Sequence, residues 1–187
     1  MDRKHNHPPD DDCAICAGGG MTQERLQAYL TKCGQIIEKV GWMCQGVMDD
    51  PPYTYSIGMS RLGFPEIIMV GFSMQTAHGL INHVGNLMKS SHTITDWTKS
   101  TEVIDNFPVY FREISAQSIE ENCGMLERLA EHGFAASSHR MLQLFLPDKQ
   151  GYFPWQKECV PKFRMQYELN MRYKTVLSFG IPAPVGF

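Results

Sequence analysis

The stretch from Trp42 to Phe72 constrains the fold more than any other part of the chain. Two strand-like runs, Trp42–Met48 and Tyr53–Met59, flank the sequence Asp-Asp-Pro-Pro. Proline cannot donate a ladder hydrogen bond, so the prolines must lie in a connection, and four connecting residues suit an antiparallel hairpin. A third run, Glu66–Phe72, is almost continuously apolar, as expected for a central strand covered on both faces. The stretch therefore predicts three consecutive strands.

Helical periodicity lies on both sides of this stretch. Between Leu26 and Val40 apolar residues recur every three or four positions, with Thr22 placed as an N-cap and Gly41 as a terminating glycine. After the third strand, Ser73 can cap a helix over 74–90. Ser73 also sits where a hydrolase nucleophile elbow would lie, but Gln75 replaces the second glycine of that motif.

The second half of the chain mixes strand and helix signals. We expect an irregular segment over 91–106, strands over 107–114 and 141–146, a helix over 119–132 and, in the tail, a helix over 160–173 and a strand over 175–179. This order predicts an α+β fold with a mostly antiparallel central sheet of about five strands and two to three packed helices. We divide the chain into an N-terminal arm (1–20), a domain (21–155) and a C-terminal extension packed on it (156–187).

Composition excludes several classes of protein. The chain is 43% hydrophobic and 20% charged, with a net charge of −3, so it is globular and lacks the basic surface of a nucleic-acid-binding protein. Its longest apolar run is strand-sized, and no membrane span is expected. Six cysteines spread over a domain of this size are typical of reduced thiols or metal ligands, which predicts a cytoplasmic protein. A homo-oligomer is compatible with this composition.

Six motifs occur in one order over residues 13–155. They are GWxxQxV from Gly41, PPYTYSIGM from Pro51, FPEIIMVGF from Phe64, AxxLIN from Ala77, LQL from Leu142 and DxxGxFPW from Asp148. Together they resemble the bacterial domain of unknown function 4262 family, some members of which carry a C-x-x-C before the first helix. Ala17-Gly18-Gly19 replaces the His-Pro-Gly often found in the family, and about 30 residues follow Trp155 where members usually end sooner. The resemblance implies no activity.

The N-terminal arm contains a metal-binding pattern. Cys13 and Cys16 have the spacing of a zinc knuckle, and a structural zinc site needs four ligands. The ligand set we predict is Cys13, Cys16, His5 and His7, with Cys33 and Cys44 as alternatives to the histidines. Two free thiols in a mobile arm are the other interpretation.

Polar and aromatic residues at turns and element ends outline a pocket for a ligand. One wall combines Tyr55 of the hairpin with the carboxylate of Glu66 at a strand end. The other wall combines Asp148 of a turn with Trp155, which follows a proline. His78 and Asn82 are four residues apart and therefore share one side of a helix. The predicted ligand-binding residues are Tyr55, Glu66, His78, Asn82, Asp148 and Trp155.

These residues favour a cytoplasmic domain that binds a small polar ligand, such as a nucleotide or another metabolite. Two alternatives stay open, and so does the question whether the protein is an enzyme. One is a hydrolase that uses Glu66 or Asp148 together with His78. The other is a protein-interaction module whose zinc-bound arm and C-terminal extension contact a partner.

Overall fold

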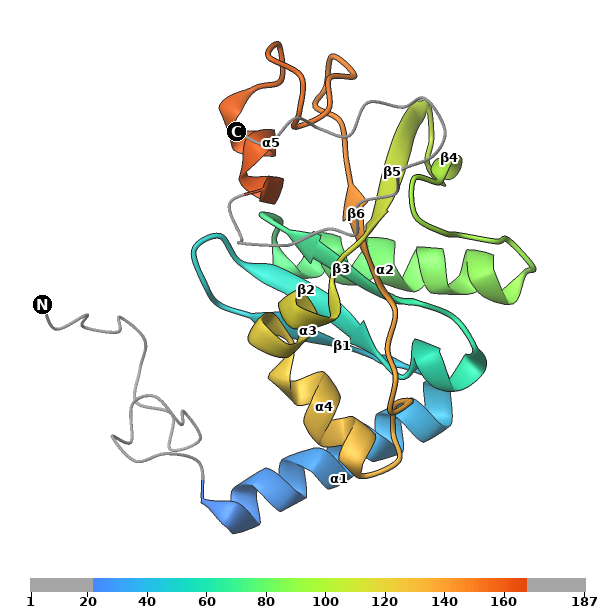
Figure 1. Cartoon of the computed structure of the whole chain (residues 1–187), viewed down its shortest axis with the longest axis vertical. Helices are drawn as coiled ribbons and strands as arrows, with labels where there is room; N and C mark the ends of the chain where they lie inside the picture. The colour runs from blue at the N-terminus through green and yellow to red at the C-terminus, as the bar shows by residue number, and fades with distance from the viewer. Residues whose placement is uncertain (1–21, 168–187) are drawn as a thin grey trace, which may run out of the picture.

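The computed structural model describes residues 22–167, in which six strands form one sheet of order β1-β2-β3-β6-β5-β4 (Figure 1). The strands are β1 (Met43–Val47), β2 (Tyr53–Ile57), β3 (Glu66–Val70), β4 (Lys99–Ile104), β5 (Phe107–Glu113) and β6 (Met141–Phe145). Neighbouring strands are antiparallel except β3 and β6, which are parallel. The predicted α+β class and the mostly antiparallel sheet are confirmed, with one strand more than expected.

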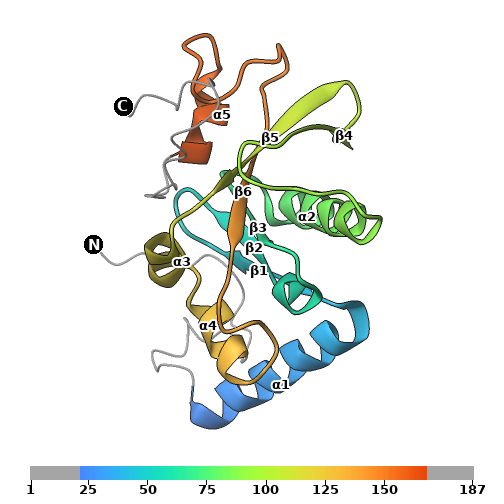
Figure 2. The same cartoon turned by 45° about the vertical axis from the view of Figure 1, so that its right-hand side comes forward.

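Helices cover both faces of this sheet (Figure 2). They are α1 (Gln23–Val40), α2 (Met74–Lys89), α3 (Ala116–Asn122), α4 (Gly124–Glu131) and α5 (Pro161–Arg164), with 3-10 turns η1 (Met59–Leu62) and η2 (Met165–Tyr167). No helix within residues 22–167 combines the length and the apolar character that crossing a bilayer requires.

The two long helices begin and end where the sequence predicts. The Thr22 hydroxyl accepts from the Arg25 N–H at 3.3 Å at the start of α1, and Gly41 follows it with a φ of 107°, which a glycine adopts without strain. At the start of α2 the Ser73 hydroxyl accepts from the Thr76 N–H at 3.2 Å. Ser73 is therefore an N-cap in this structure, a role that explains the residue without a nucleophile elbow.

Strand β3 supplies side chains to two separate cores. Ile68 and Val70 lie in the core that includes the buried faces of α1, α3 and α4. Ile67 and Met69 point to the opposite face, into the core that includes α2. All four side chains are fully buried, and burying each contributes about 1.5–3 kcal/mol. The continuous apolar run that predicted a central strand is the consequence of this two-sided burial.

The prediction of an irregular segment over 91–106 is wrong for its second half. Lys99–Ile104 forms β4, which pairs with β5 at the edge of the sheet. An edge strand leaves much of its surface in water, so β4 needs few apolar residues and lacks a clear alternation. Val103 is buried, while Lys99, Thr101 and Glu102 are exposed. The polar sequence of β4 is therefore the reason why the sequence pattern did not predict this strand.

The helix predicted over 119–132 is two helices. α3 ends at Asn122, whose side-chain amide donates to the Ser118 carbonyl at 2.8 Å, and α4 begins at Gly124. Between them Cys123 has a ψ of 39°, outside the helical range, and its side chain is fully buried. Because α3 and α4 contribute to the same core, their apolar residues continue one helical periodicity. The periodicity therefore does not reveal that the helix is interrupted at Cys123.

The tail follows its prediction in part. Of the helix expected over 160–173, the structure shows the short helix α5 and the turn η2. The strand expected over 175–179 and the arm over 1–20 lie outside the described residues.

Two glycines of α2 offer a matched test of the packing on this face. Gly79→Ala should stabilise the fold by about 0.5–1 kcal/mol, because a Cβ there meets nothing within 4 Å and alanine favours a helix. Gly85→Ala should destabilise it by about 1–3 kcal/mol, because its Cβ would lie 2.6 Å from a Trp42 ring carbon and 2.8 Å from the Met59 methyl group. Chemical denaturation measures both, and equal effects at the two sites would contradict the packing.

Candidate ligand-binding site

The parallel pairing of β3 with β6 brings the carboxyl ends of these two strands to the same edge of the sheet. Ligands of open sheets with parallel strands commonly bind just outside such ends. A cavity of about 480 Å³ lies there, within the usual size range of small-molecule sites. It is lined by Gly71, Phe72, Lys149, Gln150, Val160, Lys162 and Phe163.

Three segments form the walls of this cavity. Phe72 follows β3, Lys149 lies in the loop after β6, and Phe163 belongs to α5. The rings of Phe72 and Phe163 meet edge to face, with centroids 6.0 Å apart and planes at 75°. Lys149 and Lys162 are exposed, and none of the lining residues among those described is acidic. The cavity therefore combines an aromatic wall with positive charge.

The segment 156–167, here called the strap, is fixed to β6 by a buried amide. Gln166 Nε2 donates to the Leu146 carbonyl at 2.9 Å, and its Oε1 accepts from the Leu146 N–H at 2.8 Å. Gln143 Nε2, from β6, donates to the Gln166 carbonyl at 2.6 Å. Both glutamine side chains are buried, so this pairing satisfies amide groups that would be costly to leave alone.

Gly71 lets the strap approach the end of β3. Its φ of 80° lies in the left-handed region, and a Cβ at this position would stand 3.2 Å from Met165 Cβ and 3.3 Å from the Met165 carbonyl carbon. A larger residue would therefore be strained and would also push the strap away. The cavity depends on this close approach, because Val160, Lys162 and Phe163 all lie in the strap.

Asp148 joins the loop after β6 to the strap. Its Oδ1 accepts from the N–H groups of Gln150 at 2.9 Å and Tyr152 at 3.0 Å, and its Oδ2 accepts from the Val160 N–H at 3.0 Å. Burial acts to raise the pKa of this carboxyl, but the N–H groups of Val160, Tyr152, Gln150 and Gly151 outweigh it and hold the pKa below its usual range. Asp148 thus shapes the cavity wall without lining it.

Glu66 is a structural carboxylate at the other end of β3. It is completely buried; Oε2 accepts from the Ser56 hydroxyl at 2.6 Å, and Oε1 accepts from the N–H groups of Gly58 at 2.9 Å and Ser60 at 3.0 Å. Its strand partner is Met141, the first residue of β6. Glu66 therefore lies at the amino ends of the parallel pair, away from the cavity at the carboxyl ends.

Two other predicted residues lie on the two faces of the sheet. Tyr55 is buried in the core beside α1 and α4, where its ring stacks on Tyr53 at 6.3 Å, and burial raises its pKa. Asn82 lies on α2, where its Oδ1 accepts from the Trp42 indole N–H at 2.8 Å and ties the helix to the start of β1.

The last two predicted ligand-binding residues, His78 and Trp155, lie in different parts of the structure. His78 is an exposed residue of α2. Trp155 belongs to an aromatic cluster at the β5–β6 end, stacked on Phe153 at 4.8 Å and edge to face with Phe145 and Tyr110 at 5.7 Å. The six residues predicted from the sequence thus occupy separate places, and none of them lines the cavity at the carboxyl ends of β3 and β6.

The residues that do line this cavity are neighbours of the predicted motifs. Lys149 and Gln150 are the two variable positions of the DxxG motif, and Phe72 is the last residue of the FPEIIMVGF motif. Lys162 and Phe163 stand in the tail, where the sequence carries mixed signals. Sequence reasoning selected the turn-forming Asp148 and missed the side chains that the turn presents.

A second cavity, of about 560 Å³, has the opposite electrostatic character. Glu120, Glu127 and Glu131 line it together with His139. Burial lowers the pKa of His139 in spite of nearby Glu66 and Glu127, which favours the neutral form of this histidine. An anionic ligand would be repelled here.

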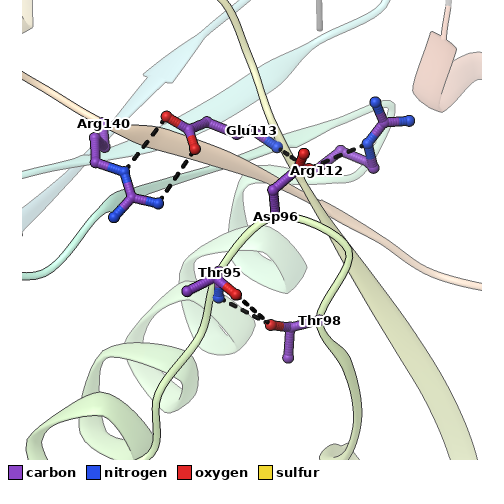
Figure 3. A network of polar contacts seen from close by, with 6 residues as sticks. All are labelled: Thr95, Asp96, Thr98, Arg112, Glu113 and Arg140. Carbon is purple, nitrogen blue, oxygen red and sulfur yellow. Dashed lines mark hydrogen bonds and ion pairs between the residues drawn. The ribbon is translucent and has the colours of Figure 1, made fainter. Parts of the chain in front are cut away.

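A polar network holds the loop before β4 (Figure 3). Asp96 Oδ1 accepts from Arg112 Nε at 3.2 Å and from the Glu113 N–H at 2.8 Å, and Arg140 pairs with the Glu113 carboxylate at 3.2 Å. The Arg112 guanidinium also lies 3.8 Å from the centre of the Trp97 ring. These contacts connect β5 to its surroundings and explain why charged residues are buried in this interior strand of the sheet.

The predicted zinc ligands Cys13, Cys16, His5 and His7 lie outside the described residues. Within residues 22–167, no group of three or more histidine, cysteine or acidic side chains is arranged to hold a metal ion. The alternatives Cys33 and Cys44 are free thiols there, and burial raises the pKa of Cys44 to about 12.

Replacing Glu66 should reveal a structural role. Glu66→Gln keeps the shape but replaces a carboxylate that accepts three hydrogen bonds by a neutral amide with one acceptor oxygen, so we expect a loss of about 1–3 kcal/mol in the free energy of unfolding. Glu38→Gln, on the exposed side of α1, should stay within about 0.5 kcal/mol of wild type. Urea titration compares them, and an unchanged Glu66→Gln protein would show that the buried contacts are dispensable.

Asp148 should make stability depend on pH. Because its pKa is depressed in the folded state, its contribution is present above about pH 4, the unfolded value, and is lost as pH falls through the folded pKa. Asp148→Asn should lower the Tm at pH 7, and the difference from wild type should shrink below about pH 4. Thermal unfolding at pH 7 to 3 tests this, with exposed Asp50→Asn as control; a difference independent of pH would contradict it.

Comparison with known proteins places the chain in a family. A family model described as a domain of unknown function, DUF4262, matches residues 36–160, which include β1 to β6 and the DxxG loop. No curated protein and no solved structure matches the chain. Since the family model covers more than half of the sequence, the chain belongs to the DUF4262 family.

Proposed function

We propose that this domain binds a small anionic metabolite in the cavity at the carboxyl ends of β3 and β6. The observation that carries the proposal is that two lysines, Lys149 and Lys162, line a cavity without acidic lining residues among those described. The whole protein is acidic, with a net charge of −3, so this local positive charge is a property of the site and not of the surface in general.

The cavity also supports binding through its construction. Its walls are joined by hydrogen bonds of the buried side chains of Asp148 and Gln166, which hold the strap against the sheet before any ligand arrives. A preformed site loses less conformational entropy on binding than a site that must first be ordered.

The hydrolase alternative has less support. The Glu66 and Asp148 carboxylates are already occupied by hydrogen bonds from the protein, so neither is available as a general base. Among residues 22–167, the structure records no hydrogen bond from His78 to either of them. The interaction-module alternative depends on the arm and the C-terminal residues outside that range.

We also infer a cytoplasmic location and keep structural zinc in the arm as a proposal. The location is supported by Cys33, Cys44, Cys123 and Cys159, which are free thiols, as expected in a reducing compartment. Metal analysis of the full-length protein, with a Cys13→Ser/Cys16→Ser variant as control, tests the zinc ligand set. We also propose the division of the chain into an arm (1–20), a domain (21–155) and a C-terminal extension (156–187).

Lysine substitutions test the binding proposal. Lys149→Ala and Lys162→Ala should each weaken binding of a metabolite anion about three- to tenfold, since each removes one partly exposed charge contact. Lys157→Ala is the matched control, because Lys157 lies in the strap, is 91% exposed and does not line the cavity. Isothermal titration with a panel of phosphorylated and carboxylated metabolites measures the affinities.

The thermal stability of the same three variants shows whether they remain folded. If no anion of the panel binds the wild-type protein, or if Lys157→Ala weakens binding as much as the other two substitutions, the proposal is wrong.

A further inference from the structure

We propose that the ligand of this cavity carries a flat aromatic ring beside its anionic group, as a nucleoside monophosphate does, and that Phe163 selects the ring. This inference rests on the proposed function and adds the class of ligand to it. It is carried by the edge-to-face pair of Phe72 and Phe163, which lines the same cavity as the two lysines.

Both rings of the aromatic pair present part of their surface to the cavity. Phe72 and Phe163 are both half-buried, so each packs on the core beside α2 with part of its surface and lines the cavity with the rest. Their planes stand at 75°, which forms a corner. A ring placed in such a corner can stack on one phenylalanine while it meets the edge of the other, both of which are favourable geometries.

The polar groups of the cavity suit the remainder of such a ligand. Lys149 and Lys162 come from different segments, the loop after β6 and α5, and both line the cavity, so each supplies a positive charge to its wall. Gln150 supplies an amide with both a donor and an acceptor, which is the complement of a heterocycle edge. A cavity of about 480 Å³ accommodates a ring and an anionic group together.

The two halves of the recognition come from different parts of the chain. Phe72, Lys149 and Gln150 lie within the region that the family model matches, whereas Lys162 and Phe163 follow its last residue, 160. The strap that carries them is fixed by Gln166. Phe163, which completes the aromatic pair, therefore lies outside the part of the site that the family model covers.

Three sets of probes separate the contributions of ring and anion. They are the four ribonucleoside 5′-monophosphates, the corresponding nucleosides and inorganic phosphate, each titrated calorimetrically into the full-length protein. We expect at least one monophosphate to bind about tenfold or more tightly than both its nucleoside and phosphate.

Phe163→Leu removes the ring but keeps an apolar side chain of similar length. It should reduce monophosphate affinity about five- to tenfold and leave phosphate affinity unchanged, which also shows that the variant is folded. Phe107→Leu, a half-buried phenylalanine at the start of β5, is the matched control and should change neither affinity.

The failures of the two proposals are distinguishable. If phosphate binds wild type as tightly as every monophosphate, or if Phe163→Leu weakens phosphate and monophosphate equally, the ring inference is overturned while the anion site stands. If no anion binds wild type, both the ring inference and the proposed function are overturned.

Discussion

β3 and β6 pair in parallel at the centre of the sheet, and every residue of both strands is buried. This pairing joins the β1–β2–β3 unit to the β4–β5–β6 unit, so the sheet exists as one layer because of it. It also separates the two cores, since alternate residues of β3 enter opposite faces. Because parallel strands end at the same edge, the β3–β6 pairing also brings together the loops that follow these strands. Residues of both loops line the cavity.

Buried polar side chains then hold the connections in place. Glu66 accepts hydrogen bonds from the turn at the amino ends of the parallel pair, while Asp148 and Gln166 bind the loop and the strap at the carboxyl ends. Each of these groups meets donors or acceptors of the backbone, which removes the large cost of burying it unpaired. The polar residues that stand out in the sequence therefore shape the cavity, while exposed lysines and half-buried phenylalanine rings line it.

Sequence reasoning succeeded wherever a local pattern decides the structure. The first helix begins after Thr22 and ends before Gly41, as predicted. The prolines lie in the connection of a hairpin, and the apolar run of β3 forms a buried central strand. It failed where the surroundings decide. β4 is polar because it lies at an edge, and Cys123 interrupts a helical periodicity that continues on both sides of it. The candidate site shows the same division, because the DxxG turn was found and the lysine it presents was not.

The sequence by itself determined the α+β class, the principal helices, most strands and the resemblance that the DUF4262 match confirms, because these depend on periodicity and turn chemistry over short distances. Tertiary structure alone decided that β3 lies beside β6, and with it that Phe72, Lys149 and Phe163 share one cavity. Phe72 is far from the other two residues in the chain. Only the pairing of distant strands, driven by burial of both faces of the sheet, sets which side chains meet.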